Sequence, residues 1–123
     1  MVHIAQGGDN EHSVQFFDKI ISRDVIFDII GQSYYPEWHG TLEDLETNLN
    51  DLATRYNKPI VVVEYKEHKK EVNEIVKNLP NGVGLGTFIW EATSPRWGNL
   101  FDQDGSANEN IEIYPQFYSS YNK

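Results

Sequence analysis

The chain has 123 residues, of which 39% are hydrophobic, 13% aromatic and 24% charged, so the composition predicts a folded domain and excludes a disordered segment. Acidic residues outnumber basic ones by 19 to 10, which gives a net charge of −9 and leaves no basic surface for nucleic acid. There is no cysteine and no apolar run near the roughly 20 residues that span a bilayer, so we expect no disulfide, no thiolate chemistry and no membrane insertion.

The first third of the chain alternates between strand and helix patterns. Residues 2–5 predict a strand that ends in a glycine-rich turn. A helix is expected to begin at Asn10 or Ser13 and to end at Arg23. Its apolar stripe consists of Val14, Phe17, Ile20 and Ile21. Residues 28–33 predict a second strand, and the stretch from Tyr34 to Gly40 predicts a long loop because it has no apolar period.

The clearest helix begins at Thr41, which together with Asp44 resembles a capping box. Its apolar stripe consists of Leu42, Leu45, Leu49, Leu52 and Tyr56. The β-branched run 60–64 then predicts a strand covered on both faces. A third helix at 67–79 and a fourth strand at 83–90 complete the pattern. Beyond them we expect a loop from Glu91 to Asn108 and an aromatic helical tail that Pro115 interrupts.

Strands that alternate with helices predict the α/β class with a parallel sheet. The segments that follow the strands are long and rich in tryptophan, tyrosine, histidine and aspartate, whereas the turns that precede the strands are short. In parallel α/β folds the functional residues lie at the carboxyl ends of the strands. We therefore expect the site to be built from the segments that follow the strands.

Glu64 is the most informative single residue, because it ends a rigid β-branched strand and would be delivered to the functional edge of the sheet. This position suits a nucleophilic carboxylate. It also suits a structural carboxylate that is solvated or paired with Lys58 or Lys66, and position alone does not separate the two. Glu91 occupies a similar position after the last strand and has the same two interpretations.

Aromatic and histidine side chains gather in the same segments. The aromatic residues are Trp38, Trp90, Trp97, Tyr34 and Tyr35. Aromatic residues are more often part of a core, yet three tryptophans in loops exceed what burial needs, and such faces can stack on sugar rings. His3 and His39 could bind sugar hydroxyls or tune a carboxylate, although a structural or exposed role is common for a lone histidine. The stretch Asp102–Gly105 fits a turn better than a calcium loop, so we expect no metal and no cofactor.

Three stretches resemble glycoside hydrolase family 53, the arabinogalactan endo-β-1,4-galactanases. They are Ile30–Leu42 (IGQSYYPEWHGTL), Val61–Glu64 (VVVE) and Gly84–Glu91 (GLGTFIWE). The segment from Val2 to Asn10 is similar to the fifth strand of that family and its following loop. The resemblance implies a (β/α)8 TIM barrel of a retaining hydrolase, of which residues 1–105 would form strands five to eight and residues 106–123 a helical tail packed on the same domain.

The family's functional residues carry over to this chain position by position. Glu64 matches the nucleophile, while the acid/base glutamate follows strand four of the family barrel and has no counterpart here. The positions that match substrate-binding or rim positions are His3, Asp9, Ser33, Tyr34, Trp38, His39, Trp90 and Glu91. Tyr65–Glu67 departs from the sequence that many relatives have after the nucleophile.

Half a barrel has two implications for partners and activity. A barrel of this type needs roughly 250 residues, so we expect either self-association or a missing N-terminal half, and little hydrolysis by the isolated chain. The expected substrate is a β-linked, plant-cell-wall-type polysaccharide. The alternative is a non-catalytic open α/β domain that binds a sugar or a protein through Tyr34, Trp38, Trp90 and Trp97. No basic segment followed by an apolar one comes after Met1, so no signal peptide is expected in this chain, and the location stays open.

Overall fold

The computed structural model describes residues 1–94 and 100–121. It divides into two compact units, Met1–Phe88 and Ile89–Lys123, and each is described by itself. The expected boundary at residue 105 and the packing of the tail on the rest of the domain stay predictions. None of the helices in the described ranges is long and apolar enough to cross a membrane.

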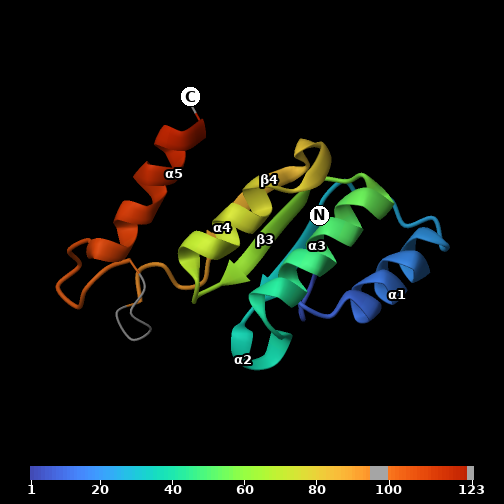
Figure 1. The fold of residues 1–123 in the computed structure, drawn as a ribbon. Coiled ribbons are helices and arrows are strands. Elements are labelled where there is room, and N and C mark those ends of the chain that lie inside the picture. Colours follow the sequence, from blue (N-terminus) through green and yellow to red (C-terminus); the bar gives the residue numbers. More distant parts are fainter. Residues whose placement is uncertain (95–99, 122–123) are drawn as a thin grey trace. The chain divides into compact units, whose positions relative to one another are not determined.

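The sheet has four strands in the order β1-β2-β3-β4, which is also their order along the chain (Figure 1). The strands are β1 (Val2–Ile4), β2 (Ile30–Tyr34), β3 (Ile60–Tyr65) and β4 (Gly84–Ile89). β2 pairs in parallel with β1 on one side and with β3 on the other. Each strand thus lies beside the next one in sequence, as successive β/α units of a barrel do. The expected α/β class with parallel strands is confirmed.

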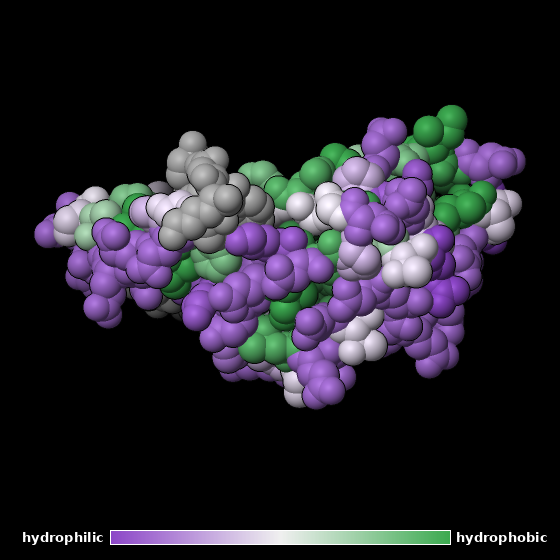
Figure 2. Space-filling model, turned by 45° about the horizontal axis from the view of Figure 1, so that its top comes forward, coloured by the Kyte–Doolittle hydropathy of each residue, from purple (hydrophilic) through white to green (hydrophobic). Residues whose placement is uncertain are grey.

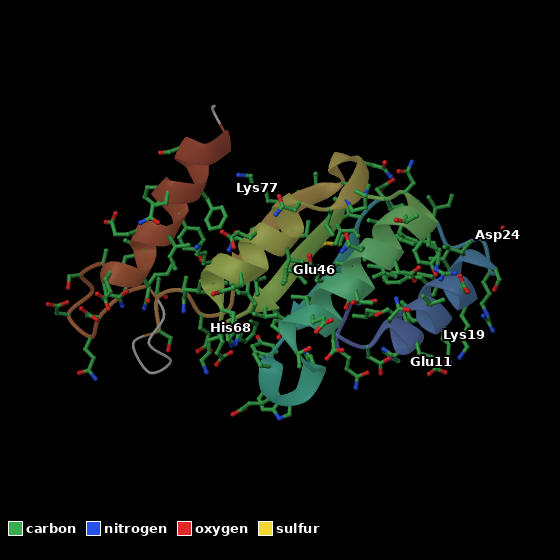
Figure 3. All side chains as sticks on the ribbon, in the orientation of Figure 1. Glu11, Lys19, Asp24, Glu46, His68 and Lys77 are labelled. Atoms are coloured by element: carbon green, nitrogen blue, oxygen red, sulfur yellow. The ribbon has the colours of Figure 1, made fainter. Side chains whose placement is uncertain are left out.

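Helices connect the strands. They are α1 (Asn10–Ile21), α2 (Pro36–His39), α3 (Leu42–Tyr56) and α4 (Lys69–Lys77), followed by a 3₁₀ turn, η1 (Pro80–Gly82). Asp9 caps α1, since its Oδ1 accepts a hydrogen bond from the amide of His12 at 2.9 Å. Glu11 and Lys19 lie at opposite ends of α1 (Figure 3), where their charges complement the helix dipole.

The capping box predicted for α3 is present. Thr41 Oγ1 accepts from the amide of Asp44 at 3.1 Å, and Asp44 Oδ2 accepts from the amide of Thr41 at 2.8 Å. At the other end, Asn57 adopts a left-handed conformation with φ of 47° and ends the helix. The predicted stripe is confirmed at its centre, where Leu45, Leu49 and Leu52 are fully buried, whereas the side chains of Leu42 and Tyr56 are half-buried.

One face of the sheet packs against these helices, and the opposite face is open. The residues that form the packed core include Phe17, Ile30, Ile60, Val62, Val72 and Val76. On the open face, the side chains of Leu85 and Phe88 are 59% and 66% exposed. Gly86 separates them with φ of 137°, a conformation that glycine adopts readily and that marks a break in the strand's alternation. Figure 2 shows apolar areas within a largely hydrophilic surface.

Several element predictions need correction. Residues 36–39 form the short helix α2 where a loop was expected, because Pro36 suits a first helical position and the amides of Trp38 and His39 bond the carbonyl of Tyr35. β2 begins at Ile30 instead of Asp28. The side chain of Ile21 is 41% exposed, since it lies in the last turn of α1.

The second unit contains a 3₁₀ turn, η3 (Glu109–Glu112), and a helix, α5 (Ile113–Tyr121). Pro115 does not interrupt this helix, because it lies in the first turn, where the missing amide hydrogen is not needed. The turn predicted at Asp102–Gly105 is confirmed by the hydrogen bond from the amide of Gly105 to the carbonyl of Asp102 at 3.0 Å. An antiparallel bridge joins Phe101 and Ala107 on either side of this turn.

Candidate active site

Glu64 is half-buried near the carboxyl end of β3, and an irregularity in strand pairing sets the direction of its side chain. Gln32 pairs with Val62, but the next residue, Ser33, pairs with Glu64. Val63 is therefore the extra residue of a β-bulge, which reverses the alternation of side chains beyond it. Glu64 consequently points to the same face as Ser33, which is the open face of the sheet.

Neighbouring residues confirm the two directions. Tyr65, which follows Glu64, is fully buried, and its hydroxyl accepts a hydrogen bond from Asn73 Nδ2 of α4 at 2.9 Å. Gln32, which precedes Ser33, donates to Ser13 of α1 at 3.0 Å. Because successive residues of a strand point to opposite faces, Ser33 and Glu64 lie on the face away from the helices.

Three strands bring polar groups together at this point. Tyr35, which follows β2, donates from its hydroxyl to Glu64 Oε2 at 3.3 Å. His3 on β1 lies with its Nε2 2.6 Å from Ser33 Oγ. The arrangement thus contains a carboxylate with one oxygen held by a phenol, next to a hydroxyl and an imidazole that can hydrogen-bond a ligand. Of the two lysines considered as alternative partners, Lys58 donates to the carbonyl of Phe27 and Lys66 pairs with Glu67.

Two residues of α2 contact the ring of Tyr35. The Tyr35 ring lies edge-on to Trp38 and His39, with ring centroids 5.8 Å and 5.7 Å away. Trp38 is 70% exposed and available for stacking. Trp38, His39 and Asp9 also line a polar hollow of about 360 Å³ between the β1–α1 segment and α2. The predicted residues Trp38, His39 and Asp9 are therefore neighbours in the structure, although Asp9 Oδ1 also caps α1.

Tyr34 lies apart from this group. Its side chain is 1% exposed and its hydroxyl donates to the carbonyl of Gly40 at 3.2 Å, so it braces the segment before α3 from the helix side of the sheet. Burial, followed by the charges of Asp44 and Glu67, raises the pKa of its phenol. The side chain of Tyr34 therefore does not reach the open face, where a ligand would bind. Alternate residues of a strand point to the same face, so the spacing from Ser33 to Tyr35 could have identified Tyr35 from the sequence instead.

Trp90 and Glu91 follow β4 directly and belong to the second unit. Trp90 is 45% exposed, and Glu91 has a positive φ of 47°. Trp97 lies outside the described residues. Of the residues of the surface proposed for a non-catalytic binding domain, Tyr34 is buried, whereas Trp38 and Trp90 are exposed, and the surface as a whole stays a prediction. In residues 1–94 and 100–121, no group of three or more histidine, aspartate or glutamate side chains is arranged to hold a metal ion.

Comparison with known proteins relates the chain to polysaccharide hydrolases. A protein of Niallia circulans, described as "Uncharacterized protein in bgaB 5'region", is 38% identical over 130 residues, with 79% of this chain and 35% of that protein covered. Arabinogalactan endo-beta-1,4-galactanase A of Aspergillus niger is 24% identical, with 92% of this chain and 40% of that protein covered. The chain thus spans little more than a third of the length of the curated relatives it matches.

Solved structures show the same fold. One of two fungal beta-1,4-galactanases superposes with a TM-score of 0.82 at 21% identity, covering 94% of this chain and 47% of the other. The GH53 catalytic domain of Ignisphaera aggregans gives 0.79 at 24% identity, covering 91% and 44%. The fold is therefore that of part of a (β/α)8 barrel, as the resemblance implied. The sequence pattern of "Glycosyl hydrolase family 53" matches residues 1–71, more than half of the chain, and the chain belongs to that family.

Proposed function

We propose that this chain supplies the nucleophile-bearing half of a retaining glycoside hydrolase that cleaves β-1,4-galactan or a related plant-cell-wall polysaccharide. The observation that carries the proposal is the direction of Glu64. Its carboxylate lies at the carboxyl end of a barrel strand, faces the open side of the sheet and has one oxygen bound by Tyr35. Family membership and the named galactanases among the relatives support the substrate class.

In this proposal each polar group has a role that its position supports. With Oε2 of Glu64 held by the Tyr35 hydroxyl, the other carboxylate oxygen would attack the anomeric carbon and form a covalent glycosyl intermediate. The glycosidic bond to the next sugar breaks in the same step, and the acid/base carboxyl of the complete barrel protonates the departing oxygen. Water then hydrolyses that intermediate. Ser33 and His3 lie beside the nucleophile and would bind sugar hydroxyls, and exposed Trp38 would stack on a sugar ring farther along the polymer.

A retaining mechanism needs a second carboxyl about 5–5.5 Å from the nucleophile. In this proposal that group follows strand four of the barrel, which precedes the four strands present here. Its functional partner is therefore the half-barrel of strands one to four, whether in the same polypeptide or supplied separately. No cofactor takes part in the proposed chemistry.

The test completes the barrel by fusing the first four β/α units of a family 53 galactanase in front of Met1. We expect this fusion to release reducing ends from β-1,4-galactan, and its Glu64→Ala variant to lose nearly all turnover while still binding galacto-oligosaccharide. Azide should restore product formation by Glu64→Ala from a galactoside with a good leaving group, because azide replaces the missing nucleophile. Glu46→Ala, on the exposed surface of α3 (Figure 3), is the matched control and should behave as wild type.

Two results would count against the proposal in different ways. Substantial galactan hydrolysis by the Glu64→Ala fusion means that Glu64 is not the nucleophile. Tight oligosaccharide binding by a folded wild-type fusion that never hydrolyses galactan favours the non-catalytic binding domain.

A further inference from the structure

His39 contacts the backbone twice through the same ring nitrogen. Its Nδ1 lies 3.1 Å from the amide nitrogen of Tyr35 and 3.0 Å from the carbonyl oxygen of Ser33. An unprotonated Nδ1 offers a single lone pair, which can accept a hydrogen bond from the Tyr35 N–H, whereas a protonated Nδ1 can only donate to the Ser33 carbonyl. The two contacts therefore correspond to alternative protonation states of the same nitrogen.

The helix α2 contacts both the main chain and the ring of Tyr35. Its carbonyl accepts hydrogen bonds from the amides of Trp38 at 3.0 Å and His39 at 2.9 Å. Its ring makes edge-on contacts with the rings of the same two residues. Its own amide lies at the N-cap position, outside the internal hydrogen bonds of the helix, and the His39 ring offers that amide an acceptor. The main chain and the ring of Tyr35 are thus both fixed by α2, and its hydroxyl extends to Glu64.

We propose that His39, in the tautomer with Nδ1 unprotonated, is a positioning residue that fixes the main chain of Tyr35 so that the Tyr35 hydroxyl meets Oε2 of Glu64. His39 itself need not touch the substrate. The positioning stands on the contacts alone, and only its consequence for turnover rests on the proposed function. This role differs from the sugar-binding role that the sequence suggests for His39, and it assigns the residue to the support of the carboxylate.

The surroundings of His39 favour the neutral ring, which is the only form in which Nδ1 can be unprotonated. Burial lowers the pKa of His39, and the contact with the Ser33 carbonyl and the charge of Glu64 act in the opposite direction. The other charged groups that line the hollow beside the ring are Asp9, from the β1–α1 segment, and Asp44, from α3. Because burial is the largest of these influences, the neutral imidazole is the form expected at neutral pH.

Nitrogen-15 NMR of the full 123-residue chain tests the positioning without any activity assay. At neutral pH we expect His39 Nδ1 to give the signal of an unprotonated nitrogen and Nε2 that of a protonated one. His39→Asn keeps an oxygen acceptor close to the Nδ1 position and should preserve the amide proton and nitrogen shifts of Tyr35, which report the hydrogen bond, whereas His39→Leu should change both. His12→Leu, at an exposed position in the first turns of α1, is the control and should leave them unchanged.

The NMR result decides the proposal. A protonated Nδ1 at neutral pH, or unchanged Tyr35 signals in a folded His39→Leu chain, would overturn it. Signals from α3 and β3 show in the same spectra whether each variant is folded, so a misfolded His39→Leu chain is recognised and the tautomer of the wild-type ring then decides alone.

The completed barrel adds a kinetic measurement. If His39 acts through Tyr35, His39→Leu should lower kcat with little change in KM, and it should add little to the loss already caused by Tyr35→Phe. Independent, multiplicative losses would mean that His39 acts by another route. A wild-type fusion that never hydrolyses galactan, combined with the expected NMR result, would refute the proposed function and leave the positioning role in place.

Discussion

Gly8 brings the β1–α1 segment so close to α2 that no side chain fits between them. A Cβ atom added at Gly8 would lie 1.9 Å from the carbonyl oxygen of His39, where ordinary contact begins at 3.4 Å, so backbone would have to move by roughly 1.5 Å. Overpacking of this kind typically costs about 1–3 kcal/mol. We therefore expect Gly8→Ala to reduce the free energy of unfolding by an amount in this range and to shift the NMR signals of His39.

Two other glycines provide matched controls, because each receives the same methyl group in a different space. The added Cβ would lie 2.7 Å from the Ser33 carbonyl oxygen at Gly7, and at Gly31 it would lie 3.2 Å from the flexible Met1 Sδ and 3.3 Å from the Cα of His3. The loss of stability, measured by urea unfolding of the three variants, should follow the order Gly8→Ala, Gly7→Ala, Gly31→Ala. A Gly8→Ala chain as stable as the Gly31→Ala chain would show that this contact does not constrain the segment.

Thr41→Ala should lower the free energy of unfolding by about 0.5–2 kcal/mol through loss of the α3 cap, as measured by urea unfolding. Hydrogen bonds from Thr41 hold the pKa of Asp44 below its ordinary value. The cap therefore stabilises the fold at pH values above the carboxyl pKa of the unfolded chain, and this stability is lost as the pH falls through the lower pKa of the folded chain. If the difference in unfolding free energy between wild type and variant does not shrink in acid, this reasoning is wrong. The isolated chain should self-associate, because exposed Leu85 and Phe88 forgo about 25 cal/mol for each Å² of apolar surface left in water. It should also release no galactan fragments. A stable monomer in sedimentation at micromolar concentration would contradict the expected self-association, and clear hydrolysis of galactan would contradict the expected inactivity.

Features that depend on local periodicity could be read from the sequence. The leucine spacing of α3 and the Thr41–Asp44 pair predict that helix and its start, because both rest on contacts three or four residues apart. The β-branched run of β3 likewise predicts a buried strand. α2 escaped prediction because a four-residue helix is too short to show a period, and only Pro36 marks its beginning.

The tyrosine pair shows where residue type alone is insufficient. Tyr34 and Tyr35 are adjacent and chemically identical, yet the first is buried against the helices and the second bonds Glu64. Only the strand register separates them, since it decides which of two neighbours faces the open side. Once Ser33 is placed on that side, Tyr35 follows two residues later. Residue type is also insufficient for Asp9, because the same aspartate lies at the edge of the sheet where a ligand would bind and caps the helix α1.

The direction of Glu64 required information from two strands at once. Counted along β3 alone, the fully buried side chains of Ile60 and Val62 place even-numbered positions on the helix side, and Glu64 would join them. The bulge at Val63 reverses this and directs the carboxylate to the open face. A uniform β-branched run gives no sign of such an insertion, because every position in it suits both faces. Tyr65 then returns to the helix side, where its hydroxyl bonds Asn73 and Thr87 and anchors the strand directly beyond Glu64. The bulge and this anchor together convert an ordinary buried strand into a rigid support for one outward carboxylate.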